Sequence, residues 1–271
     1  MVISAFFENI RTGADAKDLP VTDALRKMQA AGLDTVYVGR DSLEEYGESL
    51  PDILKTLDIP VEGLHGWFDF AENPDGEDWK AFIDTAARWG AKHVLFVPGL
   101  NGTEERKQNM VSALRKAVDY GREKGMAVTM ENLDQLSAPY NSAEGLRWFL
   151  SQVEGLQCCF DTGNFVVHQE DELRLLEDFL PDLGSVHIKD RSREKLHPED
   201  GACVCADGSA VYPAPVGDGY IQIQAILERL KEVRYRGTLI AELYGCDPEY
   251  MLDGMLRSVS WLRSHISGGT P

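Results

Sequence analysis

The sequence is short of positive charge. Lysine and arginine together number 27, against 45 aspartates and glutamates, which gives the 271 residues a formal net charge of −18. A field of that sign repels phosphate backbones and anionic lipid headgroups. The composition therefore argues against nucleic acid and against a charged membrane surface as partners.

Long apolar runs and a targeting leader are missing as well. No apolar stretch approaches the roughly 20 residues that cross a bilayer, and no basic-then-apolar segment opens the chain. The five cysteines form no repeating framework, and Cys203 and Cys205 have no matching second pair, which indicates reduced thiols and disfavours a structural zinc site. We expect a cytoplasmic protein without a membrane segment.

No glycine-rich phosphate-binding loop follows the first predicted strand. What recurs is a short β-rich run followed by a segment with helical spacing. Strands are expected at residues 2–7, 34–39, 61–68, 93–99, 127–133, 158–164, 185–190 and 238–245, and the clearest helices at 23–32, 77–90, 105–125 and 221–233. Eight such units predict one α/β domain, residues 1–271, folded as a (β/α)8 TIM barrel, with a doubly wound open sheet as the alternative.

One connection departs from this regular alternation. Residues 191–219 join the seventh strand to the following helix, whereas such connections usually have about 2–6 residues. Because the segment leaves the carboxyl end of a strand, it has to pass over the mouth of the barrel. We expect it either to close the site, with Arg191 or Arg193 on the substrate, or to form a subunit contact in a homo-oligomer.

Ionisable side chains recur late on the last four predicted strands. Alternate residues of a barrel strand face the interior, and this alternation turns one metal-competent side chain inward near the end of each strand. The four are Glu131, Asp161, His187 and Glu242. Singly, each has an ordinary alternative, such as a helix cap or a buried histidine. Together they would crowd three carboxylates into one low-dielectric site, where like charges need a cation.

The motifs that carry these residues resemble those of the xylose isomerase-like sugar isomerase/epimerase superfamily. VTMENLD, CFDTGNF, SVHIKDR, PVGDG and LIAELYG occur in that order. The resemblance implies a TIM barrel in which the four residues bind one divalent cation. Two departures stand out: Asn164 replaces a histidine that the family often carries, and the loop after Glu131 offers only Asp134 where the ketose epimerases have a further glutamate.

Three carboxylates and one imidazole suit Mn²⁺ best, with Mg²⁺, Co²⁺ or Zn²⁺ as alternatives. A sugar held through adjacent oxygens would have its carbonyl polarised, and Glu131 and Glu242 could exchange the neighbouring proton from opposite sides. Lys189 also faces inward on the strand of His187. We expect Lys189 either to hold an enediolate oxygen, as a catalytic group, or to form a salt bridge with Asp161 or Glu242.

Four further residues are candidates for contact with the substrate. His65 and Trp67 share the inward face of the third strand, where they would hydrogen-bond to and stack on a sugar ring, or else pack as barrel interior. Asn164 and Arg191 are the other two.

These features together predict a divalent-metal-dependent sugar isomerase or epimerase. It would act on a small ketose or aldose by proton transfer through a metal-bound enediolate. A lyase or dehydratase on the same site, acting on an inosose-like polyol or an oxidised glycoside, stays open because the same proton removal permits β-elimination. A sugar-binding subunit without catalysis is a third reading. The apurinic endonuclease branch of the fold needs a histidine-rich three-metal cluster, which six histidines in a strongly acidic chain do not favour.

Overall fold

Eight parallel strands close into a barrel in the computed structural model, which describes residues 1–47 and 49–266. The predicted domain also takes in Glu48 and residues 267–271, which lie outside the described residues. The barrel strands are β1 (Val2–Phe6), β2 (Thr35–Gly39), β3 (Val61–Trp67), β4 (His93–Val97), β5 (Ala127–Glu131), β6 (Gln157–Asp161), β7 (Leu183–Ser192) and β10 (Thr238–Glu242). Since β10 pairs with both β7 and β1, the sheet is closed, which confirms the predicted TIM barrel and excludes the open sheet.

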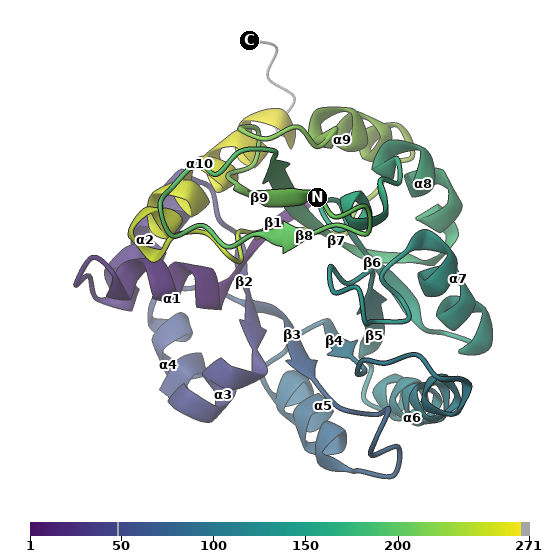
Figure 1. Ribbon diagram of the computed structural model, residues 1–271. Helices are drawn as coiled ribbons and strands as arrows, with labels where there is room; N and C mark the ends of the chain where they lie inside the picture. Colours follow the sequence, from purple (N-terminus) through teal and green to yellow (C-terminus); the bar gives the residue numbers. More distant parts are fainter. Residues whose placement is uncertain (48, 267–271) are drawn as a thin grey trace.

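The helices surround the strands, as Figure 1 shows. They are α1 (Phe7–Asp15), α2 (Val21–Ala31), α3 (Arg40–Tyr46), α4 (Ser49–Thr56), α5 (Asp78–Arg88), α6 (Glu104–Glu123), α7 (Ala143–Gln152), α8 (Glu172–Phe179), α9 (Ile223–Glu232) and α10 (Pro248–Ile266). Their ends follow local chemistry: the side chains of Thr103, Ser142 and Asp171 accept backbone N–H bonds at the starts of α6, α7 and α8. Within the described ranges, no helix is long and apolar enough to span a bilayer.

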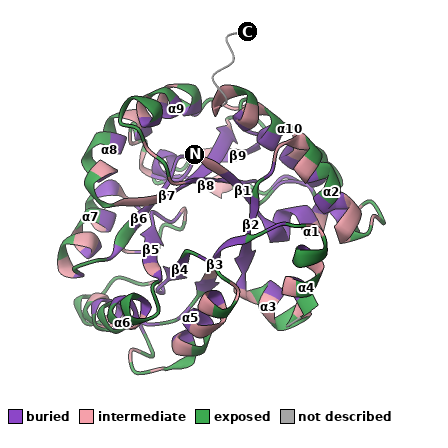
Figure 2. Ribbon diagram, turned by 180° about the vertical axis from the view of Figure 1, so that it is seen from behind, coloured by how far each residue is buried: buried purple, intermediate pink, exposed green. Residues whose placement is uncertain are grey.

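The strands are almost completely buried, whereas the outer faces of the helices are exposed (Figure 2). Inside the barrel, the fully buried ring of Tyr37 lies beneath the carboxyl ends of the strands, in contact with the rings of His65 and His187. A Cβ on Gly63 would lie 2.5 Å from the Tyr37 ring, so the missing side chain on β3 makes room for it. The Tyr37 ring therefore packs beneath the two histidines at the carboxyl ends of the strands.

The segment 191–219 contains strands of its own. β7 continues to Ser192, and the segment holds two further strands, β8 (Cys203–Val204) and β9 (Ala210–Ala214). β9 pairs antiparallel with both β7 and β8. In Figure 1 both strands lie inside the ring of helices, beside β7. Backbone pairing with the end of β7 therefore orders part of the long connection that the sequence predicts.

One carboxylate fastens the far end of this segment to the barrel. Asp190 on β7 accepts backbone N–H bonds from Arg191 (2.8 Å), Gly217 (2.9 Å), Gly219 (3.0 Å) and Ile221 (3.2 Å). A Cβ on Gly219 would lie 2.1 Å from Asp190 Oδ1, so the turn requires glycine there. The PVGDG motif therefore attaches the end of the segment to β7.

Asp190→Ala is expected to lower the free energy of unfolding by about 2 kcal/mol, because it removes the acceptor that four backbone N–H groups share, two of them on buried residues. Urea denaturation would measure the change. Asp218→Ala is the matched control in the same turn: Asp218 is exposed and pairs with the exposed Arg257 at 2.6 Å, so its removal should change stability by less than about 1 kcal/mol. Equal effects of the two substitutions would contradict the anchoring role.

Candidate active site

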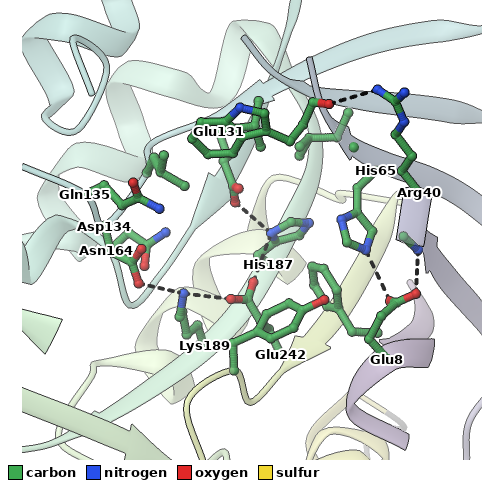
Figure 3. Close-up of a pocket in the computed structure, with 18 of the residues that line it drawn as sticks. Glu8, Arg40, His65, Glu131, Asp134, Gln135, Asn164, His187, Lys189 and Glu242 are labelled. Atoms are coloured by element: carbon green, nitrogen blue, oxygen red, sulfur yellow. Dashed lines mark hydrogen bonds and ion pairs between the residues drawn. The ribbon is translucent and has the colours of Figure 1, made fainter. Parts of the chain in front are cut away.

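The carboxyl ends of β5, β6, β7 and β10 bring the four predicted metal ligands together. One ligand atom from each of Glu131, Asp161, His187 and Glu242 lies within 4.8 Å of the others, and all four residues are buried. His187 Nδ1 lies 2.9 Å from Glu131 Oε2 and 3.2 Å from Glu242 Oε2 (Figure 3). Strand register accounts for part of this convergence, because Asp161 pairs directly with His187 across β6 and β7.

The cluster has the chemistry of a cation site. Asp161 Oδ2 is buried and accepts no hydrogen bond from any described residue, although it lies 3.9 Å from His187 Nδ1. The charged groups at the cluster are four carboxylates, Glu131, Asp134, Asp161 and Glu242, and two cations, Lys189 and Arg191. With all four carboxyl groups ionised and the His187 imidazole neutral, as metal ligands require, they leave two negative charges, which one divalent ion would cancel. The residues therefore fit a divalent cation bound through oxygen and imidazole donors.

The pKa values of Asp161 and Glu242 are shifted in opposite directions. Burial, and after it the negative charges of Glu242 and Glu131, raise the pKa of Asp161 well above its usual value despite the nearby ammonium of Lys189. Glu242 is also buried, yet Lys189 and His187 hold its pKa below the usual range. Without a cation, burial and the neighbouring negative charges therefore favour the protonated form of Asp161.

Lys189 forms the salt bridge that the sequence left open as an alternative. Its Nζ lies 2.6 Å from Glu242 Oε1 and 3.9 Å from Asp161 Oδ2. It also donates to Asp134 Oδ2 at 3.1 Å, a partner that sequence reasoning did not assign. Although burial opposes the charge, Asp134 and Glu242 raise the pKa of Lys189, so it stays an ammonium ion. Because Lys189 still lines the cavity, it can also donate to a bound oxygen.

Arg191 lies behind the wall of the cavity. It is 2% exposed, and it is not among the described residues that line the cavity. Its Nη2 donates to Asp134 Oδ2 at 2.6 Å and to Asn164 Oδ1 at 3.2 Å. Both partners line the cavity, so Arg191 holds two wall residues in place, and its direct contact with substrate stays a prediction. The Arg193 guanidinium lies over the ring of Tyr220 instead, 4.8 Å from its centroid.

The cluster opens into a cavity of about 400 Å³. Side chains that line it include Phe6, Glu8, Arg40, His65, Trp67, Glu131, Asp134, Gln135, Asn164, His187, Lys189, Glu242 and Tyr244. Trp67 is 41% exposed, so its ring is free to stack on a bound ring, whereas His65 lies deeper. Glu8 was not anticipated. The signal that could have found it is its position two residues after the carboxyl end of β1, the usual place for barrel chemistry.

Residues 25–265 match the family model described as xylose isomerase-like TIM barrel. An inosose dehydratase of Lacticaseibacillus casei is 23% identical over 255 residues, 83% of this chain and 83% of its own. That of Geobacillus thermodenitrificans (strain NG80-2) is 26% identical over 145 residues, 52% of this chain and 48% of its own. The chain thus spans about half the length of the Geobacillus relative in that alignment.

Two solved structures share the architecture over almost their whole lengths. D-allulose 3-epimerase from Methylomonas sp. superposes with a TM-score of 0.75 at 16% identity, covering 98% of both chains. The IOLI protein, solved with a zinc atom bound, superposes with a TM-score of 0.75 at 17% identity, again covering 98% of both. At such identities the likeness shows the fold alone. The family match, together with the motifs and the closed barrel, shows that this chain belongs to the xylose isomerase-like TIM barrel family.

Proposed function

We propose that this protein removes the proton beside the carbonyl of a small keto-sugar or keto-polyol, and returns a proton as an isomerase or epimerase. The observation that supports this most directly is the buried cluster of Glu131, Asp161, His187 and Glu242 at the base of a cavity of monosaccharide size. These four residues would hold one divalent cation, with Mn²⁺ as our choice for this donor set. When bound, such an ion polarises the carbonyl and lowers the pKa of the adjacent C–H bond.

The chain itself supplies the groups that move protons. Glu131 and Glu242 enter the cluster from β5 and β10, so one can take the proton and the other can return it. One base suffices for isomerisation, whereas two allow inversion at the carbon. The Lys189 ammonium donates toward the oxygen on which negative charge develops as the proton leaves.

The substrate that we propose is uncharged. In the part of the chain that the structure describes, the lysine and the arginine that line the cavity are already paired: Lys189 with Glu242, and Arg40 with Asp78 at 3.2 Å and Glu44 at 3.2 Å. A phosphate would need such cations free, because its recognition depends on charge-assisted bonds from arginine or lysine. The other charged lining residues are acidic, which supports a polyol rather than a sugar phosphate.

Dehydration is the second candidate. It is favoured by the sequence relatives that are called inosose dehydratases, one of which aligns over 83% of both chains. Loss of a hydroxyl from the carbon beside the deprotonated one would convert a cyclic keto-polyol into an unsaturated product. The first step is the same proton removal as in isomerisation.

The test is proton exchange in D₂O. With Mn²⁺ and a panel of ketoses and inososes, we expect deuterium at the carbon beside the carbonyl, loss of exchange on chelation, and recovery when Mn²⁺ is restored. Mass spectrometry would register dehydration as the loss of one water. A protein that keeps its full exchange rate without metal, or that binds these sugars and exchanges none of them, would refute the proposal.

A further inference from the structure

A second pair of ionisable side chains lines the cavity on the side away from Lys189. Glu8 Oε2 lies 3.3 Å from Nε2 of His65, and both residues belong to the cavity wall. Figure 3 shows His187 and Glu242 between this pair and Lys189. The pair is thus separate from the candidate metal ligands but faces the same substrate space.

The carboxylate of Glu8 is fixed from behind. Its Oε1 accepts the backbone N–H of Gly39 at 2.8 Å and the hydroxyl of Ser42, while its Oε2 faces His65. Although burial opposes the charge, the hydrogen bonds and charge of His65, and the hydrogen bond of Ser42, hold the pKa of Glu8 below its usual value. These three contacts fix the carboxylate with Oε2 toward the imidazole. The carboxylate can therefore orient the ring of His65.

Gly39 makes the pair sterically feasible. Its φ of −79° is open to any residue, so the backbone does not require glycine. A Cβ there would, however, lie 2.9 Å from Glu8 Cδ and 2.9 Å from His65 Cε1. Gly39 and His65 are also direct partners across β2 and β3. The absent side chain thus lies at the place where the two groups meet.

The imidazole is held by rings as well as by Glu8. His65 stacks on Tyr37, with the ring centroids 5.2 Å apart. Phe6 packs against His65 in an edge-to-face arrangement, with the centroids 4.7 Å apart. Phe6 also contacts His187 at 4.9 Å, which places one aromatic ring between His65 and the metal cluster. Among residues 1–47 and 49–266, the imidazole of His65 has no hydrogen-bond partner besides Glu8, and because that contact uses Nε2, Nδ1 has no protein partner.

We propose that His65 is the general acid of a β-elimination: it protonates the departing hydroxyl of the keto-polyol, and Glu8 positions its ring. The inference rests on the proposed function, because a carboxylate of the cluster must first accept the α-proton. The C–H electron pair then becomes the new C=C bond, and the C–O bond breaks with its pair on oxygen. That oxygen takes a proton from Nδ1 of His65 and leaves as water, while the Nε2–H stays hydrogen-bonded to Glu8. Exchange of one proton each with solvent resets the carboxyl and the imidazole, and nothing is oxidised or reduced overall.

The test compares two leaving groups. A β-hydroxy keto-polyol needs an acid, whereas its β-fluoro analogue releases fluoride without being protonated. In the metal-loaded enzyme, His65→Ala should slow release of water by about 10²–10⁴-fold, the usual range for a general acid, and added imidazole should restore part of the rate. Release of fluoride should fall far less. Equal losses for both substrates, or no loss for either, would overturn the inference.

Glu8 is tested as a positioning residue. Glu8→Gln and Gly39→Ala should reproduce the selective loss of water release, and because fluoride release is measured on the same sample, a folding defect would lower both rates. Nitrogen-15 NMR of the metal-free protein should show His65 protonated at Nε2 in the parent and a changed ring signal in both variants. His197→Gln is the control, since His197 stacks on Tyr250 outside the cavity. Unchanged rate ratios and ring signals in the two variants would leave Glu8 a packing residue.

The two proposals fail separately. If the parent protein exchanges the α-proton but releases neither water nor fluoride, the proposed function stands and the inference is overturned. If it shows neither exchange nor release, both are wrong.

Discussion

Replacing Glu131 by glutamine is expected to slow α-proton exchange by about 10²–10⁴-fold, because the amide keeps the size of the side chain but cannot accept a proton. The substitution also removes a negative oxygen that lies 2.9 Å from His187 Nδ1, so metal occupancy has to be measured in the same sample. Deuterium incorporation is measured at saturating Mn²⁺, and elemental analysis gives the metal content. Together they distinguish the loss of a proton acceptor from the loss of a metal ligand.

Glu62→Gln is the matched control for this experiment. Glu62 is equally a buried barrel glutamate, 2% exposed, but it lies near the start of β3 and pairs with Lys92 at 3.1 Å. Its removal should affect stability and leave exchange nearly unchanged. An exchange rate within a few-fold of the parent in metal-loaded Glu131→Gln would show that another group takes the proton.

His187→Ala is expected to weaken Mn²⁺ binding by more than about 100-fold, beyond the 10–100-fold that follows the loss of an outer-shell partner. Lys189→Ala should leave the affinity within about tenfold of the parent or raise it, because all four ligands remain and a competing positive charge disappears. That charge lies 2.6 Å from Glu242 Oε1. The substitutions of His187 and Lys189, which share one face of β7, should therefore differ sharply in their effect on Mn²⁺ affinity.

Metal titration of the two variants decides the point, with the parent protein as reference. Equal affinities would place His187 outside the coordination shell. Lys189→Ala should instead slow the exchange of a saturating substrate, since its ammonium faces charge that develops only as the proton leaves. A lysine variant with unchanged exchange would reduce Lys189 to a structural ion pair.

The predicted barrel and the convergence of the four ligands both follow from local pattern. Alternation within 185–190 turns His187 and Lys189 to one face, and the rule that chemistry gathers at the carboxyl ends of strands favours inward residues late on each strand. Position along a strand and parity are properties of a few neighbouring residues. A single sequence therefore suffices to predict them.

Pairings between distant segments lie beyond such reasoning. Glu8 contacts His65 only because β1 and β3 flank β2. Gly39 has a φ that any residue can adopt, so the sequence does not indicate that its missing side chain makes room for this contact. Nothing local in the sequence indicates that Asp134, in the loop after β5, pairs with the guanidinium of Arg191 on β7 at 2.6 Å. In each case the partner is fixed by the closed barrel rather than by sequence spacing.

The double attachment of the segment after β7 has a consequence for how such a barrel can diversify. Pairing of Ser192 with Tyr212 and the Asp190 anchor hold both ends of the intervening stretch, so its length can change without disturbing the strand that bears His187. Doubling a loop between fixed ends adds only about 0.6 kcal/mol of closure entropy. Insertions and deletions within this stretch can therefore accumulate in evolution while the strand that bears His187 keeps its position.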